Sequence, residues 1–95
     1  MVRIPNNFRH LVDHKPGSRL DGFVSFIDFG PTVLHLAGLG IDNQMDGRPF
    51  LGPSIAARVL ATRDEAFGYA DRFDEKYDHV RTLRKGRFAY VRNYQ

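Results

Sequence analysis

The residues best suited to chemistry in this chain are a carboxylate and a guanidinium group that adjoin near its last quarter. Asp71 and Arg72 follow an expected strand and begin a segment rich in acidic residues. Arginine holds anionic oxygens through paired hydrogen bonds, so Arg72, with Asp71 beside it, is a candidate for binding an anionic group. A salt bridge from Arg72 to Asp71, Asp74 or Glu75 is the alternative interpretation, and the sequence leaves both open.

Metal binding is not favoured by the spacing of the histidines and carboxylates. His10 and His14 are four residues apart, which suits two ligands on one helix, but Pro16 follows closely and argues against a stable helix. The carboxylates between residues 71 and 78 could hold calcium, yet they lack the spacing and the glycine of an EF-hand loop. A solvated acidic loop is therefore expected at residues 71–78.

Length and composition allow one small domain and exclude several kinds of site. The chain has 95 residues, 42% of them hydrophobic, which suits a modest core. It has no cysteine, so disulfides, cysteine-bound zinc and a thiol nucleophile are excluded. No apolar run is long enough to span a membrane, and no signal peptide is expected at the start of the chain. The sequence does not predict a cellular compartment.

Basic residues outnumber acidic ones and give a net charge of +3. A nucleic-acid-binding surface usually gathers its basic residues in a stripe, whereas here most are spread along the chain. This makes nucleic acid an unexpected partner, and a solvated hairpin edge is the favoured interpretation of the one cluster. Binding of polyanions by this basic, aromatic hairpin is kept as the alternative function. The cluster comprises Arg81, Arg84, Lys85, Arg87 and Arg92.

The first half of the chain predicts two helices. Apolar residues recur at helical spacing over about residues 28–37, with Asp28 expected to cap the first turn and Gly38 to end the helix. Ser54 is expected to cap a second, shorter helix that runs to Leu60. Loops connect these elements.

The last third of the chain predicts antiparallel strands. Residues 66–70 alternate as a strand, and residues 79–92 form a β-hairpin in which Gly86 supplies the positive φ of the turn. Phe88 and Tyr90 are expected to share one face of the hairpin. The fold class is therefore α+β, with one main helix, a short second helix and a small antiparallel sheet that ends in the hairpin.

Two ordered blocks resemble the sulfatase family. Residues 24–39 with 45–51 are similar to the end of its catalytic domain, and residues 69–94 to the strands of its C-terminal subdomain, above all in heparan N-sulfatase-like (N-sulfoglucosamine sulfohydrolase-like) members. The resemblance implies a fragment of an alkaline-phosphatase-like fold. Residues 1–53 would be the tail of the catalytic domain and residues 54–95 part of the C-terminal subdomain.

The resemblance also implies what the parent enzyme does. Sulfatases hydrolyse sulfate esters or sulfamates with a calcium ion and a formylglycine, which is made in a Cys/Ser-x-Pro/Ala-x-Arg motif. We match neither feature to this chain, and therefore expect no catalytic residue, no metal site, no cofactor and no activity of the chain alone. The missing catalytic portion and a sulfated sugar are the expected partners, with Asp71 and Arg72 at the rim of the substrate pocket.

Overall fold

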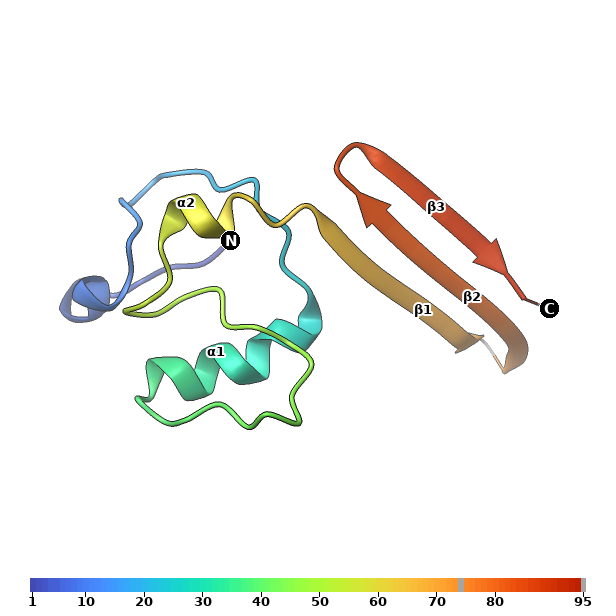
Figure 1. The fold of residues 1–95 in the computed structure, drawn as a ribbon, viewed down its shortest axis with the longest axis horizontal. Helices are drawn as coiled ribbons and strands as arrows, with labels where there is room; N and C mark the ends of the chain where they lie inside the picture. Colours follow the sequence, from blue (N-terminus) through green and yellow to red (C-terminus); the bar gives the residue numbers. More distant parts are fainter. Residues whose placement is uncertain (74, 95) are drawn as a thin grey trace. The chain divides into compact units, whose positions relative to one another are not determined.

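The computed structural model describes residues 1–73 and 75–94, which divide into two compact units, Met1–Arg63 and Asp64–Gln95 (Figure 1). The first unit is helical and loop-rich, and the second is an antiparallel sheet, so the α+β class is confirmed. No helix among the described residues is long and apolar enough to cross a membrane. The elements are a 3₁₀ helix at Asn6–Leu11, a 3₁₀ turn at Phe26–Asp28, α1 at Phe29–Leu36, α2 at Ala57–Leu60, β1 at Glu65–Phe73, β2 at Lys76–Lys85 and β3 at Phe88–Asn93.

The main helix forms where the sequence predicts it and ends as predicted. The 3₁₀ turn at Phe26–Asp28 leads directly into α1. Gly38 takes a φ of 75°, and the N–H groups of Gly38 and Leu39 donate to the carbonyls of His35 and Leu34. This pair of hydrogen bonds is a Schellman motif, which satisfies the last carbonyls of the helix and needs a residue that tolerates positive φ.

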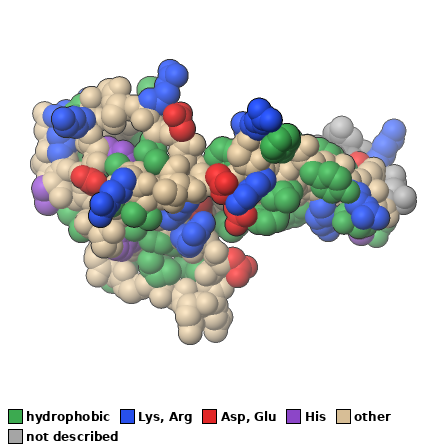
Figure 2. Space-filling model, turned by 45° about the horizontal axis from the view of Figure 1, so that its top comes forward, with side chains coloured by type: hydrophobic (Ala, Val, Ile, Leu, Met, Phe, Trp, Pro, Cys, Tyr) green, Lys and Arg blue, Asp and Glu red, His purple; other side chains and the backbone are tan. Residues whose placement is uncertain are grey.

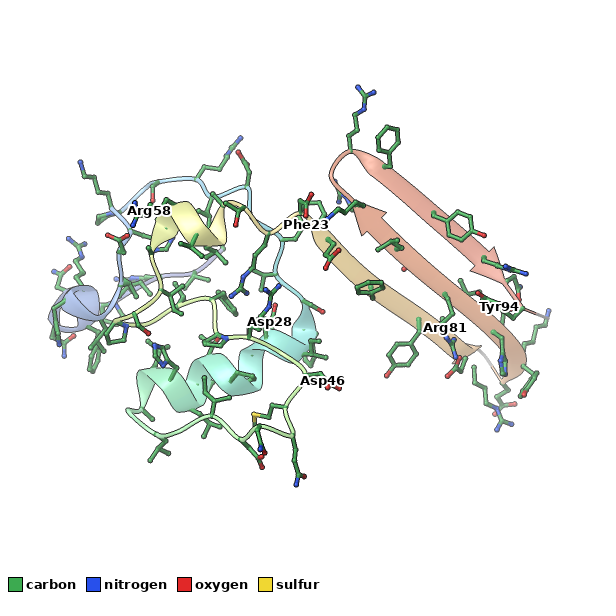
Figure 3. The ribbon with its side chains drawn as sticks, in the orientation of Figure 1. Phe23, Asp28, Asp46, Arg58, Arg81 and Tyr94 are labelled. Carbon is green, nitrogen blue, oxygen red and sulfur yellow. The ribbon has the colours of Figure 1, made fainter. Side chains whose placement is uncertain are left out.

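Asp28 does not cap α1 with its side chain, contrary to the sequence prediction. Its carboxylate accepts the N–H of Ser25 at 2.9 Å and the N–H of Arg48, twenty residues away, also at 2.9 Å. Arg63 approaches the same carboxylate at 3.8 Å. Asp28 is buried and lies at the start of α1 (Figure 3), so it joins three separated segments of the first unit rather than one helix end.

The second helix is shorter than predicted and has a different cap. Its four residues begin at Ala57, and Ser54 lies outside it. The free N–H of Ala57 is taken by the carboxylate of Asp13 at 3.0 Å, from a loop far away in the sequence. Asp13, which is distant in the sequence, thus caps α2 in place of Ser54.

The core of the first unit is small. Phe50, Leu60 and Pro31 are its only buried apolar side chains among the described residues. Gly47 lets two backbone segments approach, because a Cβ there would lie 2.0 Å from the carbonyl oxygen of Ile27. A hollow of about 1150 Å³ remains in this unit, lined largely by apolar side chains that include Val24, Phe29 and Leu60.

The second unit is a three-stranded antiparallel sheet in the order β1-β2-β3. Gly86, with φ 55°, starts the turn between β2 and β3, as predicted. The expected acidic loop at residues 71–78 is largely wrong, because β1 continues to Phe73 and β2 begins at Lys76. Pairing of Arg72 with Tyr77 and of Phe73 with Lys76 extends the strands, and Glu75 turns the chain with φ 64°.

The boundary between the two compact units lies between Arg63 and Asp64. The sequence placed a domain boundary after Pro53, on the basis of the resemblance to a larger enzyme. That division concerns the parent protein and stays a prediction.

Candidate functional site

One face of the sheet gathers the aromatic and basic side chains of the second unit. The strand register places residues directly opposite one another in three rows that cross all three strands. Directly opposed residues point to the same side of a sheet, so these rows form one surface, which we term the aromatic–arginine face. Its rows are Glu65–Lys85–Phe88, Phe67–Leu83–Tyr90 and Tyr69–Arg81–Arg92.

The aromatic side chains of this face are exposed to solvent. Phe67 is 71% exposed, Tyr69 78% and Tyr90 59%. Figure 2 shows hydrophobic and basic side chains side by side on this part of the chain. An exposed cluster of large apolar side chains is typical of a binding surface.

Arginine side chains lie over several of these rings. The guanidinium carbon of Arg81 lies 5.7 Å from the centre of the Tyr69 ring, and that of Arg92 lies 4.6 Å from the centre of the Tyr94 ring. Such cation–π contacts hold a guanidinium near a ring while its N–H groups stay available for hydrogen bonds. Figure 3 labels Arg81 and Tyr94 on the sheet.

The opposite face of the sheet is different in kind. Its rows are Ala66–Arg84–Ala89, Gly68–Thr82–Val91 and Ala70–Val80–Asn93, which are mostly small residues. Gly68 lies so close to its neighbour that a Cβ there would be 2.6 Å from the hydroxyl oxygen of Thr82. This face offers no aromatic surface.

The two predicted site residues lie where the strand pairing becomes irregular. The register shifts between Ala70 and Arg72, so Asp71 sits at the irregularity. Its carboxylate accepts a hydrogen bond from Arg81 of β2, within a salt bridge in which both side chains are about half exposed. Arg72 is exposed and lies opposite Tyr77. The structure thus joins Asp71 to the aromatic–arginine face, and substrate binding by Asp71 and Arg72 stays a prediction.

Lys85 ends the same face in a small acidic cluster. Its ammonium lies 2.8 Å from Asp64 and 3.4 Å from Glu65. The hydrogen bond to Asp64 is the main cause that raises the pKa of Lys85, and the charge of Glu65 adds to it. Lys85 is therefore partly neutralised by its neighbours, whereas the two arginines of the last row face each other.

The histidines and carboxylates do not form a metal site among the described residues. No group of three or more His, Cys, Asp or Glu side chains there could hold an ion. His10 is exposed on the 3₁₀ helix, and His14 lies beyond its end. Asp74, a member of the alternative calcium loop, lies outside the described residues. The donor set of the described residues therefore does not fit the calcium ion that the family resemblance implies.

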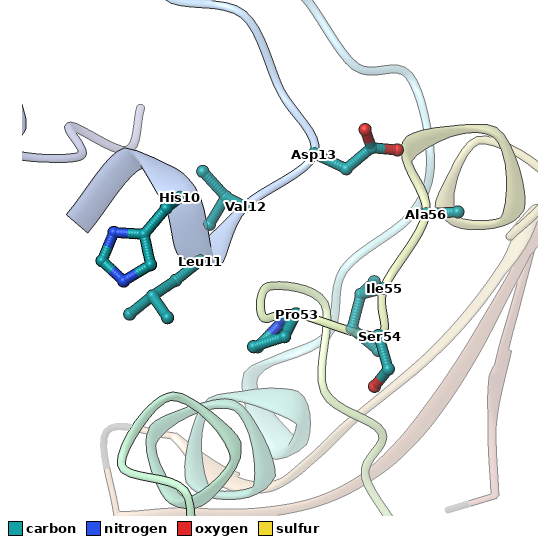
Figure 4. A pocket seen from close by; sticks show the side chains of 8 residues that line it. All are labelled: His10, Leu11, Val12, Asp13, Pro53, Ser54, Ile55 and Ala56. Carbon is teal, nitrogen blue, oxygen red and sulfur yellow. The ribbon is translucent and has the colours of Figure 1, made fainter.

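One segment fits the formylglycine motif, and reasoning from the sequence missed it. Ser54 is followed by alanine at the third position and by Arg58 at the fifth, as Ser-x-Ala-x-Arg requires. The Ser54 hydroxyl lies 3.1 Å from Nε2 of His35. Ser54 also lines an open hollow of about 310 Å³ between the 3₁₀ helix and the segment before α2 (Figure 4).

The surroundings of Ser54 do not complete a sulfatase site. Asp13, the carboxylate at this hollow, is occupied by the N–H of Ala57. Hydrolysis of a sulfate ester needs a cation to offset the charge of the sulfate, and no described cluster of ligands supplies one here. The segment at Ser54 therefore matches the motif in its residue types, but the described residues around it do not provide the cation ligands of a sulfatase site.

The first unit keeps its loops in place through a buried ion pair. Arg63 donates from its guanidinium to the carbonyl of Pro49 at 2.7 Å, next to its contact with Asp28. Burial is the main cause that lowers the pKa of Arg63, the charge of Arg48 lowers it further, and Asp28 opposes both. These groups satisfy backbone atoms of the chain itself, which indicates a structural role.

A search of curated proteins finds a sulfatase. The chain is 39% identical over 72 residues to the ulvan-active sulfatase of Formosa agariphila, an alignment that covers 76% of this chain and 11% of that protein. No protein-family model matches the sequence. The alignment supports a relationship to the sulfatase family and fits a sulfatase fragment.

Proposed function

We propose that this chain is the C-terminal part of a sulfatase-like hydrolase that acts on sulfate esters or sulfamates of sugars, in the heparan N-sulfatase-like group. The observation that carries the proposal is the 39% identity to a sulfatase over 72 residues. The ordered blocks at residues 24–51 and 69–94 support it, because they resemble consecutive parts of such enzymes. The α+β architecture agrees with the same origin.

In this proposal the chain releases no sulfate by itself. Sulfate hydrolysis needs an activated nucleophile and a cation. The described residues offer no ligand cluster for a cation. The catalytic portion of the enzyme would supply the nucleophile and calcium, with Asp71 and Arg72 at the rim of the substrate pocket.

The test is a sulfate-release assay with sulfated and N-sulfated saccharides. We expect no release by the chain alone, and release once the chain is combined with the product of the coding sequence upstream of Met1. Release by the chain alone, or an upstream sequence without any sulfatase-like segment, would contradict the proposal.

Mass spectrometry of Ser54 makes the test sharper. After co-expression with a formylglycine-forming enzyme, we expect the peptide that contains Ser54 to keep the mass of serine. Loss of two hydrogen atoms from that peptide would show that Ser54 is a modification substrate, and would assign the nucleophile to this chain.

A second candidate function is polyanion binding by the arginine-rich, aromatic hairpin. The observation that favours it is the exposed aromatic–arginine face, in which Arg81 and Arg92 lie over tyrosine rings. This function needs no catalytic group and is compatible with a chain that is inactive alone.

A further inference from the structure

We propose that the aromatic–arginine face binds a sulfated polysaccharide chain, with sugar rings lying on its aromatic side chains and sulfate groups held between Arg81 and Arg92. The inference rests on the second candidate function above and specifies its ligand, its face and its residues. It concerns retention of a polymer on the sheet, and no hydrolytic step is assigned to this face.

The like charges of Arg81 and Arg92 favour binding of an anion beside them. Arg81 and Arg92 are directly opposite each other in the register of β2 and β3. Like charges at opposed positions destabilise a sheet. Asp71 offsets one of the two charges through its salt bridge to Arg81. A sulfate between the guanidinium groups would remove the remaining repulsion and accept hydrogen bonds from both.

The aromatic rings supply a surface for the sugar. Phe67, Tyr69 and Tyr90 come from β1 and β3 and are each more than half exposed. Neighbouring strands lie about 4.8 Å apart, so the rings on the outer strands flank Leu83 and Arg81, which project from β2 on the same face. The apolar body of a tyrosine can lie on the C–H face of a sugar while its hydroxyl stays in water.

Charge argues for a polyanion rather than a protein surface as the occupant. Asp64 and Glu65 of the β1 side pair with Lys85 and Asp71 pairs with Arg81, so Arg92 is the cation in the rows of this face that no described carboxylate pairs. A dry protein interface over this face would have to remove the Arg92 guanidinium from water, which is costly without a matched carboxylate. A sulfated polymer brings its own anions and leaves the face hydrated.

The experiment measures binding of the whole chain to dextran sulfate and to unsulfated dextran by titration calorimetry. We expect binding to dextran sulfate that weakens as salt increases, and no binding to dextran. The double variant R81A/R92A should lower the affinity by at least about tenfold, since each removes a charge-assisted hydrogen bond.

Two controls separate this site from attraction by net charge. The double variant R58A/R84A removes the same charge from exposed arginines, one in the first unit and one on the opposite sheet face, and should change the affinity by less than about twofold. Tyr90→Ala keeps all charges and should still weaken binding several-fold. Circular dichroism confirms that each variant folds as the parent does.

Three outcomes would overturn the inference. One is an equal loss of affinity in both double variants with no effect of Tyr90→Ala, which would mean binding by net charge only. Another is equal binding of dextran and dextran sulfate. The third is no polymer binding while the face becomes protected on association with a protein. The sulfate-release assay is independent, so failure of the hydrolase proposal and failure of this site give different results.

Discussion

The two units of this chain achieve order by different means. The first unit is held by a polar centre in which Asp28 joins Ser25, Arg48 and Arg63, and its core has only three buried apolar side chains among the described residues. The second unit has no buried residue among those described and is held by backbone pairing across three strands. The first unit therefore uses its polar side chains to hold its own fold, whereas the second leaves large aromatic side chains exposed on one face of its sheet.

The largest expected effect comes from breaking the polar centre of the first unit. Asp28→Ala leaves two backbone N–H groups and Arg63 without their acceptor, which should cost about 3 kcal/mol of unfolding free energy. Amide hydrogen exchange should show faster exchange in the first unit and unchanged exchange in β1–β3. Asp42→Ala is the control, because Asp42 makes one exposed turn bond to Gln44. Equal losses in both units would show that the two are not separately stabilised.

The next effect tests the close backbone approach that supports the same unit. Gly47→Ala places a Cβ against the carbonyl of Ile27 and should cost about 2 kcal/mol. Gly40→Ala serves as the matched control, because nothing lies within 4 Å of a Cβ there. Denaturant unfolding measures both. A Gly47→Ala variant as stable as Gly40→Ala would mean that the loop at residues 42–50 moves away without loss.

In the second unit the turn is the sensitive point. Gly86→Ala forces an L-residue to adopt a φ of 55° and should cost about 1 kcal/mol, felt only in the sheet. Gly40→Ala in the first unit, where nothing lies within 4 Å of an added Cβ and the backbone is not left-handed, should instead leave the sheet unchanged. Amide exchange of β3 distinguishes the two. Faster exchange in α1 caused by Gly86→Ala would contradict the separation of the units.

The smallest effect is a pH dependence at the end of the sheet. Because the pKa of Lys85 is raised in the folded chain by Asp64 and Glu65, its contribution is present below the ordinary lysine pKa of 10.5 and is lost as pH rises through the folded value. Lys85→Met should remove this dependence. Identical alkaline stability profiles of parent and variant would show that the contact adds nothing.

Local features could be predicted from the sequence, and long-range ones could not. Gly38 and Gly86 mark their helix end and turn because the required φ is a property of one residue. The cap expected from Asp28 was wrong because a 3₁₀ turn leads directly into α1 and the Asp28 carboxylate bonds Ser25 and Arg48 instead. The cap expected from Ser54 was wrong because a distant residue, Asp13, accepts the N–H of Ala57. The acidic composition of residues 71–78 indicated a loop, yet pairing across the turn extends both strands there.

The candidate site shows the same limit. The shared face of Phe88 and Tyr90 follows from strand alternation, and their exposure agrees with it. The row Tyr69–Arg81–Arg92 depends on how β1 and β3 are aligned on β2, which no single segment reveals. The fit of Ser54 to the formylglycine motif was readable from the sequence, but its neighbours needed the structure.

The most direct measurement is a nuclear magnetic resonance titration of the parent chain with dextran sulfate, following the Nε–H signals of arginines and the ring signals of tyrosines. The account predicts shifts for Arg81, Arg92, Tyr69 and Tyr90, with the signals of Arg58 and Arg84 unchanged. Equal shifts of Arg58 and Arg84, or no shift on the aromatic–arginine face, would contradict the claim that one side of the sheet is built to hold a ligand.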